Sequence, residues 1–149
     1  MNITEKIKTF EDACVQLGID AKQWLAENER KDKDVIAYLK LGIIAEALNE
    51  GWKPSFTVRE YRYCPYFRIY TKAEVDTMNN AMRKRLWLFG GCSDVGSHCG
   101  LAYSGSGVAW SYAHSNLSAR LSVKSGDLAR YFGEQFIGIW ADYLFHTQD

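Results

Sequence analysis

The residues best suited to chemistry or binding lie between positions 90 and 120. Glycine and serine fill 13 of these 31 positions, and the segment has one acidic residue, Asp94, and no lysine. Tyrosine, tryptophan and histidine are interspersed among them. Small residues allow close approach, and tyrosine and tryptophan offer a large contact area at low entropic cost, as in antibody paratopes. The composition therefore predicts a binding surface rather than an ordinary core or a solvated linker.

Two cysteines in this segment, Cys92 and Cys99, are the first candidates for a metal site or a thiol enzyme. A structural zinc site needs four ligands, usually as two close pairs, and no second pair is present. A cysteine nucleophile needs a base within hydrogen-bond reach, and nothing orients His98 or His114 for that role. We therefore predict no metal, no cofactor and no catalytic residue. Packing, or a disulfide if the chain is exported, is the simpler explanation for both thiols.

The totals of the chain limit its partners. With 149 residues it is expected to form one domain, 1–149, and its 18 basic and 18 acidic side chains balance. A neutral chain argues against duplex DNA or an anionic membrane as partner. The sequence contains no apolar run long enough for a signal peptide or a membrane span. We therefore expect the protein to be located in the cytoplasm or in a phage particle that is assembled there.

Helices are expected at the beginning of the chain. Thr9 and Asp12 predict the start of a helix over 10–17, which Gly18 ends. Asp20 predicts the start of a second helix over 21–29. A third begins at Val35, has apolar residues at helical spacing and stops before Gly51. Cys14, on the apolar side of the first helix, is expected to lie in the core.

Strands are expected in the middle of the chain. The aromatic run after Pro54 predicts two strands, broken or bulged near Cys64 and Pro65, where the proline implies an edge or an interruption. Cys64 is expected to be a packing residue. Residues 72–84 fit either a helix or a polar excursion. The remaining predicted strands are a buried one in Arg85–Gly91, a hairpin of 100–104 and 108–113, and a last one at 119–124.

A helix is expected to close the chain from Ser125 and Asp127 onward. Its apolar stripe is predicted to face the core, together with Leu86–Phe89. The stripe consists of Leu128, Tyr131, Phe132, Phe136, Ile139, Trp140, Tyr143 and Leu144. The order of elements predicts an α+β fold with N-terminal helices, a small antiparallel sheet with a Gly/Ser/Tyr-rich loop-hairpin region, and a C-terminal helix.

Alternation within 102–114 refines the binding-surface prediction. In a hairpin, residues of one parity share a face, so Trp110, Tyr112 and His114 would project together, in line with Ser104 and Ser106. Serine and histidine are poor core residues, which favours an outward orientation of this face. The alternative is that the large side chains of this face point into the core.

Three stretches carry a family resemblance. The segments LGIIAEALNEGWKPSF and SARLSVKSGDLARYFGEQFIGIWADYLF, with the aromatic strand between them, resemble a group of small uncharacterised proteins of Bacteroidetes genomes and their phages. The stretch RLWLFGGCSDVGSHCGLAYSGSGVAWSYAHSNLSARL resembles the variable region of C-type-lectin-fold proteins diversified by retroelements. That resemblance implies a lectin-like fold and a variable ligand-binding surface. In such proteins the variable codons arise by mutation of adenines in asparagine codons, which cannot produce Trp110, and the closing helix also departs from the lectin-like fold.

The site residues follow from the matching positions. They are Ser93, Asp94, Ser97, His98, Tyr103, Ser104, Ser106, Trp110, Tyr112, His114 and Asn116. The first hypothesis is a non-enzymatic ligand-binding module that presents residues 92–118 to a protein or surface ligand, without nucleic acid or membrane as partner. The alternative is a structural or accessory protein of a phage or mobile element, in which the same surface is a fixed interface of a homo-oligomer. A small thiol enzyme that uses Cys92 or Cys99 is the weakest of the three.

Overall fold

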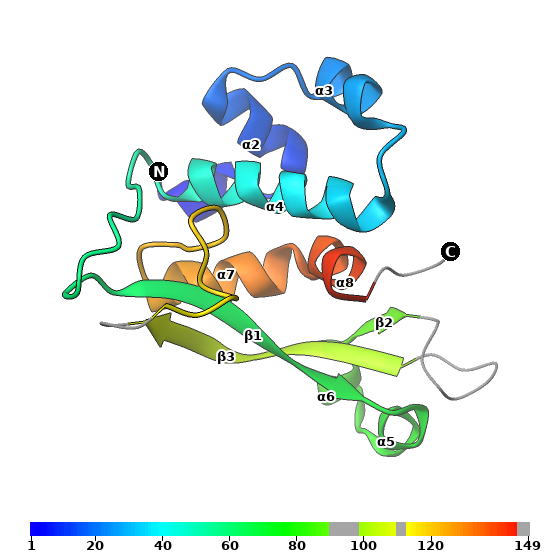
Figure 1. The fold of residues 1–149 in the computed structure, drawn as a ribbon. Coiled ribbons are helices and arrows are strands. Elements are labelled where there is room, and N and C mark those ends of the chain that lie inside the picture. The colour runs from blue at the N-terminus through cyan, green and yellow to red at the C-terminus, as the bar shows by residue number, and fades with distance from the viewer. Residues whose placement is uncertain (90–98, 110–112, 146–149) are drawn as a thin grey trace.

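The computed structural model describes residues 1–89, 99–109 and 113–145. Helices lead into an antiparallel sheet, and further helices close the chain, so the predicted α+β class is confirmed (Figure 1). In chain order the elements are α1 (Ile3–Lys6), α2 (Phe10–Leu17), α3 (Ala21–Asn28), α4 (Lys33–Leu48), β1 (Arg62–Tyr70), α5 (Lys72–Thr77), α6 (Asn80–Arg83), β2 (Trp87–Phe89), β3 (Cys99–Ala109), α7 (Gly126–Gln135) and α8 (Ile137–Phe145).

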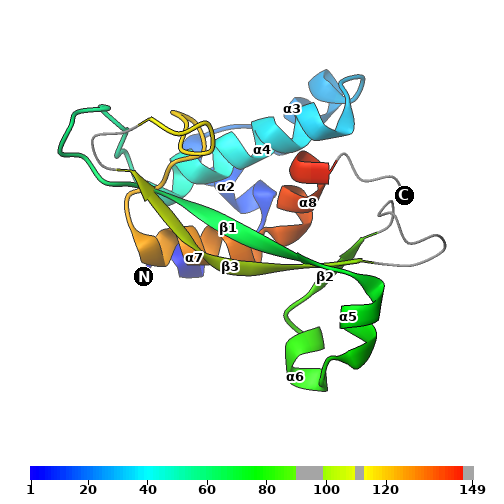
Figure 2. The ribbon, with the colours of Figure 1, turned by 60° about the horizontal axis from the view of Figure 1, so that its bottom comes forward.

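The elements form layers (Figure 1). One face of the sheet is covered by α7 and α8, and α4 packs on the far side of these helices, beneath α2 and α3. The short helices α5 and α6 project from the opposite face at one end of the sheet (Figure 2). The main core lies between α4, α7, α8 and the covered face of the sheet. None of the helices in the described ranges is both long and apolar enough to cross a membrane.

Of the N-terminal helices, α2 has the predicted bounds, α3 ends one residue early, α4 begins at Lys33 rather than Val35, and α1 was not predicted. Thr9 and Asp12 form a reciprocal capping box at the start of α2, and Gly18 ends it in the left-handed conformation at φ 72°. Asp20 accepts a hydrogen bond from the Gln23 amide at 3.1 Å and so begins α3. Cys14 is fully buried, which confirms it as a core residue.

β1 is one continuous strand, so the predicted division into two strands is wrong, whereas the predicted alternatives, a bulge near Pro65 and an edge position, are both found. The sheet order is β1-β3-β2, which places β1 at an edge where a proline removes no ladder hydrogen bond. The irregularity lies further on, where Tyr66 pairs with Gly105 and Phe67 pairs with Tyr103. Cys64 is buried as predicted, with 2% of its surface exposed.

β3 is also one strand, so the predicted hairpin within 102–114 is wrong. The hairpin of this region instead consists of β2 and β3. Because Ser104 has no partner on β1, the alternation of faces shifts there. Tyr103 and Ser106, which differ in parity, consequently join their hydroxyl groups at 2.6 Å. The prediction that residues of one parity share a face along 102–114 therefore fails at this bulge.

β2 and the segment before α7 also differ from prediction. β2 has three residues, and Trp87 and Leu88 are 44% and 52% exposed, because β2 is a short edge strand rather than a buried one. Residues 119–124 form no strand; Val123 makes a single bridge with Tyr63. Residues 72–84 hold the two short helices α5 and α6.

The predicted closing helix is divided at Phe136 into α7 and α8. The Phe136 carbonyl accepts hydrogen bonds from the Ile139 and Trp140 amides, at 3.0 and 3.1 Å, which begins the second helix. The predicted stripe is core at Leu128, Phe132, Phe136 and Trp140, half-buried at Tyr131, Ile139 and Tyr143, and exposed at Leu144.

Gly133 brings α7 close to the sheet. A β-carbon at this position would lie 2.7 Å from the Pro65 side chain and 2.9 Å from that of Tyr103. Real β-carbons essentially never approach other atoms so closely. The absence of a side chain at Gly133 therefore sets the distance between α7 and the two long strands.

Candidate functional site

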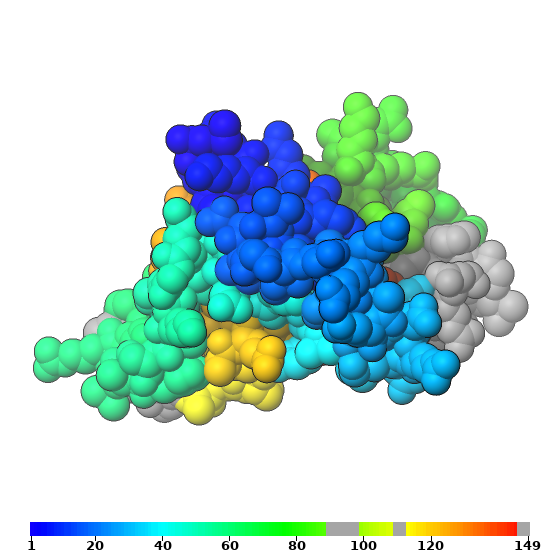
Figure 3. Space-filling model, turned by 90° about the horizontal axis from the view of Figure 1, so that it is seen from above, coloured from blue at the N-terminus to red at the C-terminus, as the bar shows by residue number. Residues whose placement is uncertain are grey.

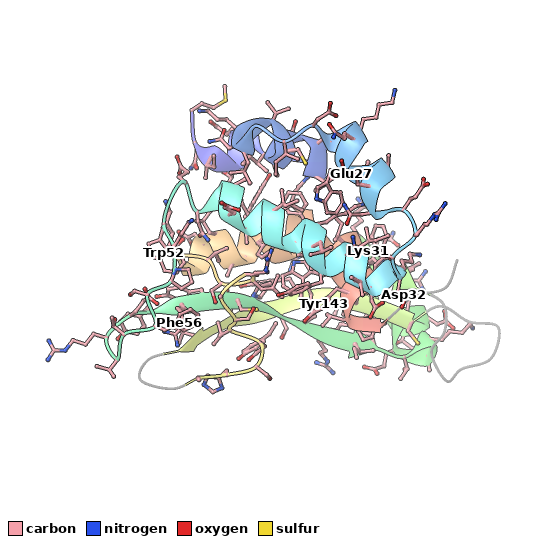
Figure 4. All side chains as sticks on the ribbon, turned by 45° about the horizontal axis from the view of Figure 1, so that its top comes forward. Glu27, Lys31, Asp32, Trp52, Phe56 and Tyr143 are labelled. Carbon is pink, nitrogen blue, oxygen red and sulfur yellow. The ribbon has the colours of Figure 1, made fainter. Side chains whose placement is uncertain are left out.

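A cavity of about 490 Å³ lies between β1, the end of α8 and the segment 115–121. Figure 4 shows one of its lining residues, Tyr143, between α4 and the sheet. Most of the lining is apolar or aromatic. It comprises Cys64, Pro65, Tyr66, Phe67, Ile69, Leu101, Ser115, Asn116, Leu121, Trp140, Tyr143, Leu144 and Phe145.

The aromatic wall of the cavity is fixed by contacts behind it. The Trp140 ring lies 5.5 Å from that of Phe67 and 5.0 Å from that of Phe132. Its indole Nε1 donates a hydrogen bond to the Phe132 carbonyl at 3.2 Å. Tyr143 continues the wall, with its ring 6.0 Å from Trp140. These tilted and edge-to-face pairs are the favourable geometries for aromatic rings, so the wall is formed before any ligand arrives.

Burial keeps two titratable groups of the cavity, Cys64 and Tyr143, neutral at physiological pH. Burial raises the pKa of the Cys64 thiol to about 12, and the thiol donates to the Pro65 carbonyl at 3.6 Å. Burial also raises the pKa of Tyr143, and Tyr38 and Cys64 add to the effect. Since the thiolate is the nucleophilic form of cysteine, Cys64 is unreactive at neutral pH. The cavity is therefore suited to an uncharged ligand.

The segment that closes one side of the cavity is held by a buried asparagine. The Asn49 side chain, at the end of α4, donates to the Ser122 carbonyl at 3.0 Å and accepts from the Lys124 amide at 3.1 Å. Tyr63 and Val123 exchange two backbone hydrogen bonds, at 3.0 and 2.9 Å. Seen from above, this segment lies beside the chain that follows α4 (Figure 3). Asn49 thereby fixes the backbone of 122–124, directly after the cavity-lining residue Leu121.

A second cleft, of about 720 Å³, lies between the middle of β3, α7 and the chain before β2. It is more polar than the first cavity, and its lining contains three cationic side chains and one anionic side chain. Glu134 is bound to Arg130 on the same helix, with 3.1 Å between the two side chains. The lining comprises Lys84, Arg85, Leu86, Trp87, Tyr103, Ser104, Arg130, Glu134 and Ile137.

The predicted site residues that the structure describes do not form one cluster. Asn116 lines the apolar cavity, whereas Tyr103 and Ser104 line the cationic cleft. Ser106 is half-buried, and His114 is exposed and lines neither. The other predicted positions, Ser93, Asp94, Ser97, His98, Trp110 and Tyr112, lie outside the described residues.

Sequence reasoning missed most of the cavity. Phe67, Trp140 and Tyr143 have the same residue types and spacing as ordinary core residues, and Trp140 was predicted only as core. Nothing in the sequence separates an aromatic ring that fills a core from one that lines a cavity. For Asn49 the only signal was a polar residue that follows the apolar residues Ala47 and Leu48 at the end of a helix.

The cysteines divide into two kinds. Cys14 and Cys64 are buried free thiols, and Cys99 is disulfide-bonded. Cys92 lies outside the described residues. Among the residues that the structure describes, no group of three or more histidine, cysteine or acidic side chains is placed to hold a metal ion.

Comparison with known proteins adds no relative. No family model matches the chain, and neither a curated protein nor a solved structure matches it.

Proposed function

We propose that this protein is a non-enzymatic ligand-binding module, and that its ligand is a small, uncharged, largely aromatic molecule. The observation that carries the proposal is the apolar cavity of about 490 Å³ beside Trp140. Binding sites for small molecules are typically concave, preformed and mostly apolar, with volumes of about 300–1,000 Å³. The cavity agrees with this description in volume and in lining.

The lining indicates how such a ligand would lie. Phe67 and Trp140 line one side of the cavity, and a planar aromatic group packs well against aromatic rings. Polar groups are few, namely the Tyr143 hydroxyl, Ser115 and the Asn116 side chain. Hydrogen bonds from one or two of these groups would orient the ligand, while the apolar wall supplies most of the affinity.

The same residues favour binding over catalysis. A thiol enzyme needs a thiolate, and burial keeps Cys64 protonated far above physiological pH. Asn116 belongs to the surface predicted from the sequence, so this proposal keeps part of the Ser/Gly/Tyr-rich stretch as a binding element. Whether retroelements diversify that stretch stays a separate prediction.

The proposal is tested by filling the cavity from its rim. Ser115 lines the cavity and is exposed to solvent. A tryptophan at this position (Ser115→Trp) should therefore occupy the space of the ligand without disturbing the core. The matched control is Ala113→Trp, an exposed position in the same segment that does not line the cavity. A panel of neutral aromatics (indole, naphthalene and 2-naphthol) serves as probe, with binding followed by fluorescence and calorimetry.

We expect at least one probe to bind wild-type protein and the Ala113→Trp control with equal affinity. Ser115→Trp should weaken that binding roughly tenfold or more, which corresponds to about 1.4 kcal/mol. Equal affinity in all three proteins would place the ligand elsewhere and refute the assignment of the cavity. Failure of every probe to bind wild-type protein up to its solubility limit would count equally against it.

A further inference from the structure

The two outer edges of the long strands differ. On β1, the outer edge is interrupted by Pro65 and paired with Val123 through Tyr63. β2 pairs with β3 only at Cys99–Leu101, where β3 begins (Figure 2). Within the described part of the chain, Ala102–Ala109 pairs with β1 alone. One side of eight consecutive residues of β3 therefore has no partner strand among the described residues.

Among the described residues, this edge lacks two of the features that usually prevent strand addition, proline and charged side chains, although it has a bulge at Ser104. Proteins protect exposed edges with proline, charged side chains or a covering element. β3 has the sequence CGLAYSGSGVA, which contains neither proline nor a charged residue. The bulge at Ser104 is the one irregularity, and Gly105 and Gly107 follow it with no side chains. An incoming backbone would meet no side chain at Gly105, whereas the Tyr66 ring covers Gly107.

The cationic cleft lies along the same edge. The residues before β2 do not extend its pairing with β3. Lys84 and Arg85 instead line the cleft together with Tyr103 and Ser104. Both cations are exposed, and neither forms a salt bridge with another described residue. Arg130 forms a third positive charge, although Glu134 partly neutralises it. The lining therefore carries an excess of positive charge beside unpaired backbone.

We propose that the edge Ala102–Ala109 of β3 binds an extended, acidic segment of a partner protein as an additional strand. The backbone of that segment would pair with β3 in the line that β2 begins, which is the β-augmentation mode of peptide recognition. Acidic side chains on alternate residues would lie in the cleft, within reach of Lys84 and Arg85. This site is separate from the apolar cavity and does not depend on the function proposed for it.

The test uses the full chain and designed peptides. The probe is an eight-residue peptide of alternating glutamate and valine, with capped ends. One comparison peptide replaces glutamate by lysine, and another has the same side chains with alternate backbone nitrogens methylated, so that these donors are lost. Affinity is measured by fluorescence anisotropy, and the contact region by NMR shifts and hydrogen exchange of the amides in 102–109.

The charge requirement is tested by the pair Lys84→Glu and Arg85→Glu. The matched control, Lys22→Glu with Arg59→Glu, changes the net charge equally at exposed positions away from the cleft. Circular dichroism and unfolding curves establish that both double variants fold. We expect the glutamate peptide to bind wild-type protein and the control alike, and the cleft variant roughly tenfold or more weakly.

The outcomes separate the proposal from its alternatives. The methylated and lysine peptides should bind at least roughly tenfold more weakly than the glutamate peptide. Full affinity of the methylated peptide would mean that charge alone attracts the chain, and strand addition would be wrong. Absence of saturable binding below about 1 mM would also overturn the proposal. If the protein alone forms a dimer that protects the amides of 102–109, the edge belongs to a second copy instead.

Discussion

Replacement of Asn49 by alanine should destabilise the protein far more than its single side chain suggests. The residue is 4% exposed, and its amide joins the end of α4 to the Ser122 carbonyl and the Lys124 amide. Alanine leaves the buried carbonyl without a partner, which costs about 1–3 kcal/mol. Loss of the part-buried bond to Lys124 adds about 0.5–1.5 kcal/mol. We expect unfolding free energy to fall by about 2–4 kcal/mol.

The control is the other buried asparagine with a side-chain hydrogen bond to a backbone carbonyl. Asn28 donates to the Trp24 carbonyl four residues earlier, at the end of α3. Asn28→Ala removes only local hydrogen bonds, this one and the one that the Lys31 ammonium donates to the Asn28 side chain, and should cost about 0.5–1.5 kcal/mol. Asn49→Asp should be at least as harmful as Asn49→Ala at neutral pH, because a buried carboxylate would face the Ser122 carbonyl.

Urea unfolding with an unchanged m-value measures the loss, and hydrogen exchange locates it. The Val123 amide, bonded to the Tyr63 carbonyl at 2.9 Å, should exchange faster in Asn49→Ala than in Asn28→Ala. A loss below about 0.5 kcal/mol for Asn49→Ala, with unchanged exchange at Val123, would refute the role of Asn49 in holding this segment.

Three further predictions concern packing, pH and origin. Gly133→Ala should destabilise the protein by about 1–3 kcal/mol, because its β-carbon would meet Pro65 at 2.7 Å, whereas Gly126→Ala, whose nearest contact is 3.8 Å, should be nearly neutral in the same unfolding assay. Burial raises the pKa of Cys64 from 9.0 to about 12, so the stability that its neutral thiol contributes is complete below pH 9 and is lost as the pH rises above it. The difference in unfolding free energy between wild type and Cys64→Ala should therefore fall by about 1.4 kcal/mol per pH unit above pH 9. A difference that does not change with pH would contradict the burial effect. If retroelements diversify residues 90–120, sequencing the surrounding genome should reveal a near-copy of these codons that differs mainly at adenines, and absence of both the copy and a reverse transcriptase gene would remove that hypothesis.

Local signals in the sequence were sufficient for the N-terminal helices. The capping box at Thr9 and the left-handed Gly18 act within a few residues of each other, so spacing alone located both ends of α2. The stripe of the closing helices was also found correctly at Phe132 and Trp140. The division at Phe136 was not, because both halves keep the same apolar periodicity.

The sheet could not be predicted in the same way. Pairing of β1 with β3 joins residues 62–70 to residues 99–109, and the bulge depends on both strands at once. Proline at position 65 indicated an edge or an interruption, and the structure has the edge strand, which the sequence alone did not distinguish from a break. The cavity is still harder to foresee, since Phe67, Leu121 and Trp140 meet only after the helices have packed on the sheet.

The pairing of β1 also determines when this protein can fold. Both neighbours of β1 come from later in the chain, β3 on one side and Val123 on the other. Tyr131 and Gln135 then bond the backbone at Ile7 and Lys8, across nearly the whole sequence. During synthesis, α2 and α4 can associate early, but β1 must wait on the ribosome without a partner. Contacts between such distant residues slow folding, so this protein completes its core only when its last helices have emerged.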